Sequence, residues 1–438
     1  MSPTRRGAII LVVMIVVLIG CFVVSFVFMP QAGVAVGLPV IIVPGEPYDP
    51  TLPVDSFRWT NTLTATVLAT LVTLIVALLG WWKSKGWKKE VPGRIQLLVE
   101  LLGGFMYNFS KQMAGKRARL VFPLVGSIFL FLLMANWMKL LPGVESVGVM
   151  HCAEVGLSGY PIIDTGSAYQ YWIDQSLDAG TGGTEENLHA CEEFKEAGEK
   201  PSSEELQAAA QHLTEEENVI TADPALTDAE KDVRVFEARM EAVEHLYHGA
   251  TVPLTPQELE MGVIPYVFTV TPYVRGATTD LNLTLALAFI SVVAIQVFGT
   301  IAQGPNYWQK YINLNALGNL KKRPLGAVDF IVGLFEIISE LGKLISLSFR
   351  LFGNMFAGGI LLAVMAFLIA LILPTIFLGL EVIVTSIQAL VFAILTLVFS
   401  AQAMEGHHGD EEHHEGHDEA HGDSVTHEAT EQTTAQSA

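Results

Sequence analysis

The apolar segment over residues 327–373 constrains the fold of this chain more than any other feature. As one continuous helix it would be about 70 Å long, whereas the hydrocarbon layer of a bilayer is only about 30 Å thick. A membrane helix of that length must be tilted, bent or broken. Pro374, which we expect to end the helix, is followed by a second apolar run over 375–403. The two runs together predict a long, strongly tilted helical hairpin.

The remaining sequence predicts a polytopic, all-α membrane protein. Hydrophobic residues make up 51% of the 438 residues, and charged residues only 16%. A membrane span needs about 20 consecutive apolar residues. Four further runs meet this length, at about 8–29, 60–82, 120–141 and 281–303. The segment 92–113 alternates apolar and polar residues at helical spacing between lysines, which predicts an amphipathic helix on the inner membrane surface.

Most of the negative charge lies in two segments outside these runs. Residues 151–260 contain 24 acidic and 5 basic residues, and residues 405–438 contain 10 acidic and no basic residues. The net charge of −20 therefore belongs to two soluble appendages, and we expect no nucleic-acid partner. The basic residues cluster before the first run, between 83 and 119, and after 303. With alternating spans all three clusters fall on one side, which the positive-inside rule assigns to the cytoplasm.

Arg350 is a charged residue within the long apolar run. Its guanidinium stays charged at physiological pH, and a charge at membrane depth costs at least a few kcal/mol. At about 100° per residue, Arg350 shares one narrow sector with the other polar positions of that helix. These positions are Glu336, Glu340, Lys343 and Asn354, and Gly358 lies in the same sector. Such a stripe predicts the wall of an ion or proton path; the alternative is a set of hydrogen bonds that hold a helical bundle together.

The sequence around Arg350, from Leu347 to Gly358, is very similar to the signature of subunit a of F-type ATP synthases. Three other blocks resemble the same family in the same order, at 129–143, 279–288 and 387–392. The resemblance covers about 55–403 apart from the acidic insert. It implies a non-catalytic membrane subunit without cofactor or metal, in which two offset half-channels pass protons to a rotating ring of c subunits. ATP chemistry would belong to partner subunits.

The resemblance also implies roles for individual residues. Arg350 corresponds to the essential arginine that faces the ring between the half-channels, and Asn354 and Gln388 correspond to its polar partners. Further positions of the proton path follow from the family and from the stripe. They are Glu336 and Glu340 on the inner side, and Glu381 and Asn136 on the outer side. Thr385 shares the helical face of Glu381 and Gln388.

Two positions depart from the family pattern. Gly359 stands where many members carry an acid or a histidine, so we expect the outer path to rely on Glu381 alone, with water near Gly358 and Gly359. Lys139 stands where a small or acidic residue is more usual. Its side chain either extends to the membrane surface, as long cationic side chains do, or pairs with a nearby acid.

The implied partners are the c-ring, the peripheral-stalk b subunits, other ATP synthase subunits and membrane lipid. The implied location is a bacterial inner membrane, crossed several times, with both termini cytoplasmic and the insert outside. The sequence leaves open whether the ion is H⁺ or Na⁺, because ring ligands largely decide this. A secondary transporter is less favoured because no inverted repeat is visible in the sequence. A purely structural scaffold is also less favoured, because helix packing alone does not need a charged residue such as Arg350.

The chain divides into five expected regions. They are an anchor span with an outer segment (1–54), the first conserved spans with the surface helix (55–143), the acidic insert (144–264), the third span with the hairpin (265–404) and a disordered tail (405–438). The His- and acid-rich tail is either a metal-binding tract or simply solvated.

The insert is expected to contain two or more polar helices, for example 203–213 and 229–248. Cys152 and Cys191 are its only cysteines and are expected outside, where disulfides persist. The sequence leaves open whether they form a bridge or remain separate thiols, because it does not give the distance between their Cα atoms. The run Leu18–Cys21 faintly resembles a lipoprotein cleavage site, but the apolar run continues, so we expect a retained anchor.

Overall fold

The computed structural model describes most of the chain between residues 42 and 405. The described stretches are 36–38, 42–48, 57–84, 94–141, 143–175, 177–311, 326–370 and 372–405, with isolated positions between 16 and 23. The expected first span at 8–29 falls almost entirely outside the described residues. The His- and acid-rich tail after Glu405 falls wholly outside them.

The body of the protein consists of long apolar helices. They are α2 (Asn61–Ser84), α3 (Arg94–Ala114), α4 (Ala118–Met138), α9 (Leu281–Gln303), α11 (Gly326–Leu368) and α12 (Ile372–Met404). By length and composition, five segments of the described chain could cross a membrane: Asn61–Trp82, Val99–Met138, Leu281–Lys310, Ile331–Leu368 and Leu373–Met404. The prediction of a polytopic, mostly helical membrane protein is confirmed. The placement of α3 along the membrane surface stays a prediction.

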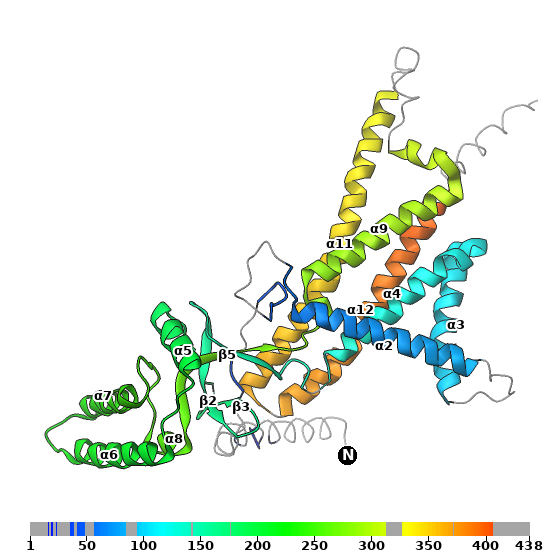
Figure 1. Cartoon of the computed structure of the whole chain (residues 1–438). Helices are drawn as coiled ribbons and strands as arrows, with labels where there is room; N and C mark the ends of the chain where they lie inside the picture. Colours follow the sequence, from blue (N-terminus) through cyan, green and yellow to red (C-terminus); the bar gives the residue numbers. More distant parts are fainter. Residues whose placement is uncertain are drawn as a thin grey trace, which may run out of the picture.

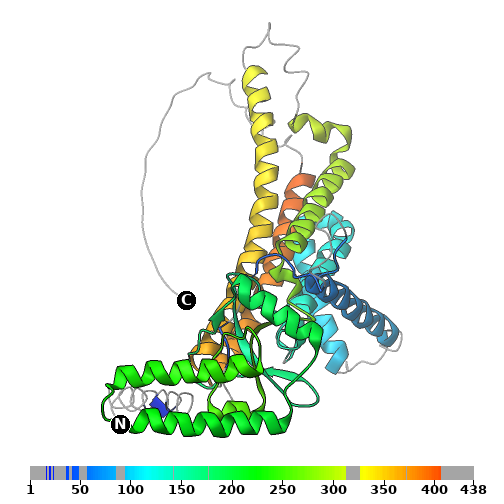
Figure 2. The same ribbon diagram turned by 60° about the vertical axis from the view of Figure 1, so that its left-hand side comes forward.

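The long apolar run forms one continuous helix. α11 contains 43 residues, which corresponds to about 65 Å at 1.5 Å per residue. The expectation that Pro374 ends this helix is wrong: α11 ends at Leu368, and Pro374 lies in the first turn of α12. A proline fits there because the first backbone N–H groups of a helix have no intrahelical partner. Figures 1 and 2 show α11, in yellow and orange, at the edge of the helical body with its N-terminal end projecting.

α12 is the central helix of the body, because it packs against α4, α9 and α11. Its small residues Ala389 and Ala393 are fully buried and allow close approach, and they belong to the main hydrophobic core with Phe392 and Leu397. In contrast, one side of α11 exposes large apolar side chains. These are Ile331, Phe335, Ile338, Leu341, Ile345 and Phe349, which we call the apolar face of α11. An exposed face of this kind requires lipid or another subunit as its neighbour.

The insert contains an antiparallel sheet that the sequence analysis did not predict. Its strands are β1 (Gly148–Cys152), β2 (Ser158–Asp164), β3 (Tyr169–Tyr171), β4 (Thr181–Gly182) and β5 (Val263–Pro272). The order is β1-β5-β2-β3, and β4 pairs with β2. The pairing of β1 with β5 joins segments more than a hundred residues apart in sequence. The sheet crosses the boundary expected at 264, because β5 continues to Pro272.

Four helices complete the insert, and Figure 1 shows them at the left of the sheet. They are α5 (Glu185–Ala197), α6 (Ser203–Ala222), α7 (Asp228–Leu246) and α8 (Pro256–Met261). Two of them, α6 and α7, contact each other. Both lie where the sequence analysis expected polar helices. Capping boxes begin α6 at Ser202, α7 at Thr227 and α8 at Thr255. In each box a hydroxyl and a glutamate satisfy backbone N–H groups that the helix leaves free.

A short N-terminal segment ties the insert to the helical body. The guanidinium of Arg275, just after β5, donates to the carbonyls of Ile42 and Pro44 and lies 3.6 Å from the Glu46 carboxylate. The backbone of Glu46 in turn hydrogen-bonds Asn61 at the start of α2. Burial raises the pKa of the Glu46 carboxyl, although Arg275 opposes this shift. The junction is therefore held by a partly buried charge pair.

Cys152 and Cys191 form a disulfide, with their Cα atoms 5.8 Å apart. The bridge joins the end of β1 to α5, and both residues are buried in the core of the insert. The hypothesis of a bridge is confirmed, and the alternative of two separate thiols is wrong.

The bridge should stabilise the insert by closing a long loop. The two cysteines are 39 residues apart, and on the chain-entropy model such a loop is worth roughly 3–4 kcal/mol. The variant Cys152→Ala/Cys191→Ala should therefore shift cleavage of the insert to lower urea, measured by limited proteolysis. Cys21→Ala serves as the control and should leave the profile unchanged. Equal resistance of the double variant and the control would show that the bridge contributes nothing.

Candidate functional site

Arg350 lies in the middle of α11, beside the apolar face. Its side chain is exposed, and its Nη2 donates to the Ser346 hydroxyl at 3.3 Å. Within the described part of the chain, Arg350 has no ion-pairing carboxylate. A permanently charged group next to exposed Phe349 and Ile345 is energetically costly unless another molecule supplies the opposite charge.

A buried carboxylate near the beginning of α11 is surrounded by cations. Glu340 is only 8% exposed. Its Oε1 accepts from Lys343 at 2.9 Å, from the Tyr311 hydroxyl at 3.1 Å and from Lys310 at 3.3 Å. Glu336, one turn earlier, is partly exposed and lies 3.5 Å from Lys310. We call these five residues the Glu340 cluster. Two ammonium groups make an ionised Glu340 tolerable in this buried position.

The turn η4 (Gly304–Lys310) after α9 brings Lys310 and Tyr311 to this cluster. Tyr307 is fixed against Gly299, where any larger residue would collide with its ring. The Tyr307 hydroxyl donates to Oε1 of Gln296 at 2.8 Å, and the Tyr311 hydroxyl shares its single hydrogen between that oxygen, also at 2.8 Å, and Glu340. The Lys310 ammonium lies 4.6 Å from the centre of each ring, a distance that favours cation–π attraction. Sequence analysis missed these partners. The available signal was Lys310 with a tyrosine on either side of it, shortly after α9.

One turn after Arg350, the two helices of the hairpin are joined by a pair of amides. Asn354 donates from Nδ2 to Oε1 of Gln388 at 2.6 Å. Asn354 is exposed beside Arg350, whereas Gln388 is buried in α12. Among the described residues, Nε2 of Gln388 has no hydrogen-bond partner. The structure thus brings together both residues predicted as polar partners of Arg350.

Towards the end of α11, a lysine and a glutamate form a buried ion pair. Lys139 Nζ lies 2.8 Å from Glu381 Oε1, and the two side chains are only 4% and 8% exposed. Lys139 Nζ also donates to the carbonyl of Met355 in α11 at 3.0 Å. The first interpretation of Lys139, a side chain extended to the surface, is therefore wrong. Lys139 directly follows α4, and its side chain points inward to α11 and α12.

The ion pair also changes the interpretation of the glycines on α11. A Cβ at Gly358 would collide with both carboxylate oxygens of Glu381, whereas a Cβ at Gly359 would meet nothing within 4 Å. The space beside Gly358 is thus occupied by the Glu381 carboxylate. The expectation that the outer path relies on Glu381 alone stays a prediction, and Lys139 is a second charged group in contact with Glu381.

Asn136 lies one turn before Lys139 and is fully buried. Its Oδ1 accepts from the Thr278 hydroxyl at 2.8 Å, and its Nδ2 donates to the Thr385 carbonyl at 3.3 Å. Thr385 is itself one turn after Glu381 on α12. The sequence analysis did not identify Thr278, which comes from the turn η3 (Ala277–Thr279) that precedes α9.

The polar groups therefore form two clusters on either side of Arg350. At 1.5 Å per residue, Glu340 lies about 15 Å from Arg350 along α11, and Gly358, which contacts Glu381, lies about 12 Å away in the other direction. Asn354 and Gln388 stand between Arg350 and the Lys139–Glu381 pair. This arrangement places one polar cluster on each side of the exposed guanidinium.

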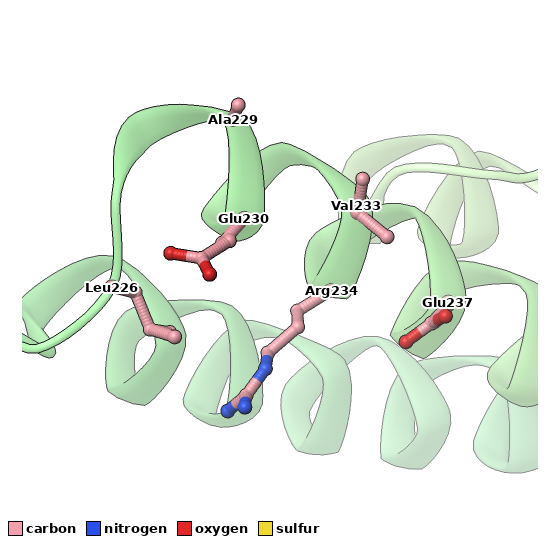
Figure 3. A pocket seen from close by; sticks show the side chains of 6 residues that line it. All are labelled: Leu226, Ala229, Glu230, Val233, Arg234 and Glu237. Atoms are coloured by element: carbon pink, nitrogen blue, oxygen red, sulfur yellow. The ribbon is translucent and has the colours of Figure 1, made fainter.

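Other parts of the described chain offer weaker candidates. Among the described residues, no group of three or more His, Cys, Asp and Glu side chains is placed to hold a metal ion. A shallow, open hollow lies on the insert, lined by Leu226, Ala229, Glu230, Val233, Arg234 and Glu237. Figure 3 shows that these side chains are spread along α7 and the turn before it instead of converging on one point.

Comparison with known proteins places these residues in a family context. A family model described as "ATP synthase A chain" matches residues 63–160 and 260–401, which is more than half of the chain. "ATP synthase subunit a" of Azorhizobium caulinodans is 34% identical over 109 residues, covering 25% of this chain and 38% of the relative. The proteins of the same name from Rhodobacter capsulatus and Mycobacterium leprae are 27% and 35% identical over 139 and 111 residues, covering 27% and 24% of this chain. These matches span 55% and 39% of those two relatives.

The contact between Gly358 and Glu381 makes a testable prediction about stability. Gly358→Ala should displace the buried carboxylate from Lys139 and destabilise the helical body by about 1–3 kcal/mol, as overpacking usually does. Gly359→Ala is the matched control, because the adjacent position has free space. Thermal unfolding of the purified protein in detergent should show a lower midpoint for Gly358→Ala only. Equal midpoints for the two variants would contradict the packing described here.

Proposed function

The chain belongs to the ATP synthase A chain family, and we propose that it is the proton-translocating subunit of a rotary ATP synthase. In this proposal it performs no nucleotide chemistry, which belongs to partner subunits. Its partners would be a ring of c subunits and the b subunits of the peripheral stalk. The residues matched by the family model include Arg350, both polar clusters and the apolar face of α11, and these features support the proposal.

The observation that carries the proposal is the unpaired charge of Arg350. Every other charged side chain described on α11 between Glu336 and Arg350 has an ionic partner. Among the described residues, Arg350 has only the Ser346 hydroxyl, and it adjoins an apolar face that needs a neighbour. A carboxylate on a ring of apolar helices would satisfy both requirements. At about 4 Å such a pair attracts by roughly 4 kcal/mol if the effective dielectric constant is near 20.

This attraction has the strength that a rotating contact requires. It favours the ionised form of a ring carboxylate beside Arg350, so a protonated carboxylate that arrives there is driven to release its proton into the exit path. At the same time it is only a few kcal/mol, so the next protonation can free the carboxylate. A fixed positive charge also opposes passage of a proton directly from one route to the other. Lysine would be a poorer barrier, since its ammonium loses its proton more readily when desolvated.

In this proposal the two clusters are the half-channels. The Lys139–Glu381 pair with Asn136 belongs to the outer path, because the insert and the disulfide lie at the same end of α11. The Glu340 cluster belongs to the inner path, with the partly exposed Glu336 as its opening. A proton entering by the outer path neutralises a ring carboxylate, travels with the ring and leaves through the inner path. The membrane potential supplies about 2.3 kcal/mol per charge per 100 mV.

We further propose a location in a bacterial inner membrane. The basic clusters of the sequence then face the cytoplasm, together with both termini, and the acidic insert faces outward. The five regions expected from the sequence follow this arrangement. An acidic, disulfide-bonded domain on the outer side agrees with the redox conditions there.

Substitution of Arg350 tests the proposed function. In closed membrane vesicles that contain the complete complex, Arg350→Ala should abolish ATP-driven proton pumping and ATP synthesis while the complex still assembles. Arg350→Lys should fail as well, because an ammonium is the poorer barrier. Ser346→Ala is the control, since it removes only the weak bond to the guanidinium, and it should retain most of the activity. Near-normal coupled pumping by either Arg350 variant would contradict the proposed function.

A further inference from the structure

We propose that Lys139 is a positioning residue of the outer proton path, which holds Glu381 in place and supplies its counter-charge. This inference rests on the proposed function and adds a second residue to the step that Glu381 performs. It is carried by the buried contact between Lys139 and Glu381 and by the second bond from Lys139 to the Met355 carbonyl.

Stability alone does not account for this pair. Removing two charges from water costs several kcal/mol per ion, and the attraction between them repays this cost only in part. Two apolar side chains of similar size would usually pack at least as stably. Both side chains are almost fully buried, and Met138, the residue before Lys139, is buried as well. A buried ionic pair at this place therefore points to a functional use of the charge.

The geometry gives Lys139 two tasks. Its bond to Met355 fixes the ammonium to the backbone of α11, one turn before Gly358, which Glu381 contacts. Its ion pair then holds the carboxylate of Glu381 against Gly358, where a Cβ would exclude it. Gly358 lies in the same helical sector as Arg350, so the carboxylate is held on the side of α11 that faces the guanidinium.

Few other charges surround the pair. Of the helices packed on α12, α9 carries no charged side chain, and α3 ends near Arg117, whose guanidinium donates to the carbonyl of Met404 at the opposite end of α12. On α11, Arg350 is the nearest charged residue to Gly358, and the Glu340 cluster lies beyond it. Two acids lie in the adjoining outer turns. They are exposed Glu145, whose carboxylate accepts from the Gly276 N–H and lies near the Lys139 stem, and buried Asp280, which accepts from Thr62.

The proposed step keeps every proton accounted for. An outer proton binds a carboxylate oxygen of Glu381, while the Lys139 ammonium keeps its own protons, so the pair changes from neutral to singly positive. The same proton then moves to a ring carboxylate, which becomes neutral, and Glu381 is ionised again. Without Lys139 the buried carboxylate would lack a counter-charge, and burial would favour its protonated form. Glu381 would then bind protons more readily from outside and release them more slowly.

The test is the dependence of ATP synthesis on the outer pH, in vesicles that contain the complete complex and have a fixed inner pH and membrane potential. Lys139→Met removes the charge but keeps most of the side-chain length. It should lower the maximal rate and raise the outer pH of half-maximal rate by at least about one unit, which is a tenfold change in proton concentration. Lys139→Arg keeps a cation and should restore a midpoint close to that of the unsubstituted protein. Glu145→Gln, which alters an exposed nearby acid, should leave the midpoint in place.

The outcomes separate this inference from the proposed function. An unchanged midpoint in assembled Lys139→Met contradicts the role of Lys139, even if Arg350→Ala still abolishes coupling. Coupled Arg350→Ala contradicts the proposed function itself. If Lys139→Met does not assemble, Lys139→His decides the question, because an imidazole loses its charge near pH 6.5. Its profile should show an additional break that the unsubstituted protein lacks, and a profile identical to the unsubstituted one would overturn the inference.

Discussion

The cost of placing charge in an apolar environment governs the whole helical body. Within the described residues, the buried carboxylates Glu340 and Glu381 each lie within 3 Å of a lysine nitrogen. Helix ends and connecting turns supply some of these partners: Lys139 follows α4, and Lys310 ends η4. Arg350 is different because no carboxylate in the described part of the chain pairs with its exposed guanidinium. The fold thus pairs Glu340 and Glu381 with lysines, whereas in the proposed function Arg350 is neutralised by a carboxylate of another subunit.

The long helix α11 makes this separation possible. Its length places the Glu340 cluster and the Lys139–Glu381 pair on opposite sides of Arg350, about 27 Å apart along the helix axis. α12 packs closely on its neighbours through buried small residues such as Ala389 and Ala393. Gln388 and Thr385, on the same helix, complete the polar contacts with Asn354 and Asn136. The insert is compatible with this arrangement because its own disulfide-bonded core is separate from the core that contains the hairpin.

Local patterns predicted most of the helical body, whereas long-range contacts were not predictable from one sequence. Apolar length and helical periodicity located α11, α12 and the sector that contains Arg350. In contrast, the contact of Lys139 with Glu381 joins positions more than two hundred residues apart, and no local pattern distinguishes an inward lysine from one at the surface. The sheet was missed for the same reason, since β1 pairs with β5 across the helices of the insert. Tyr311 reaches Glu340 only through the shape of η4.

The central claim is that two polar routes lead to Arg350 from opposite sides and do not join. Its most direct test is the accessibility of single cysteines to a small, charged, membrane-impermeant thiol reagent, in closed vesicles with the complete complex and a Cys21→Ala background. Lys343→Cys should react only from the inner side, and Thr385→Cys only from the outer side. Reaction of both cysteines from the same side, or of either one from both sides, would contradict the account.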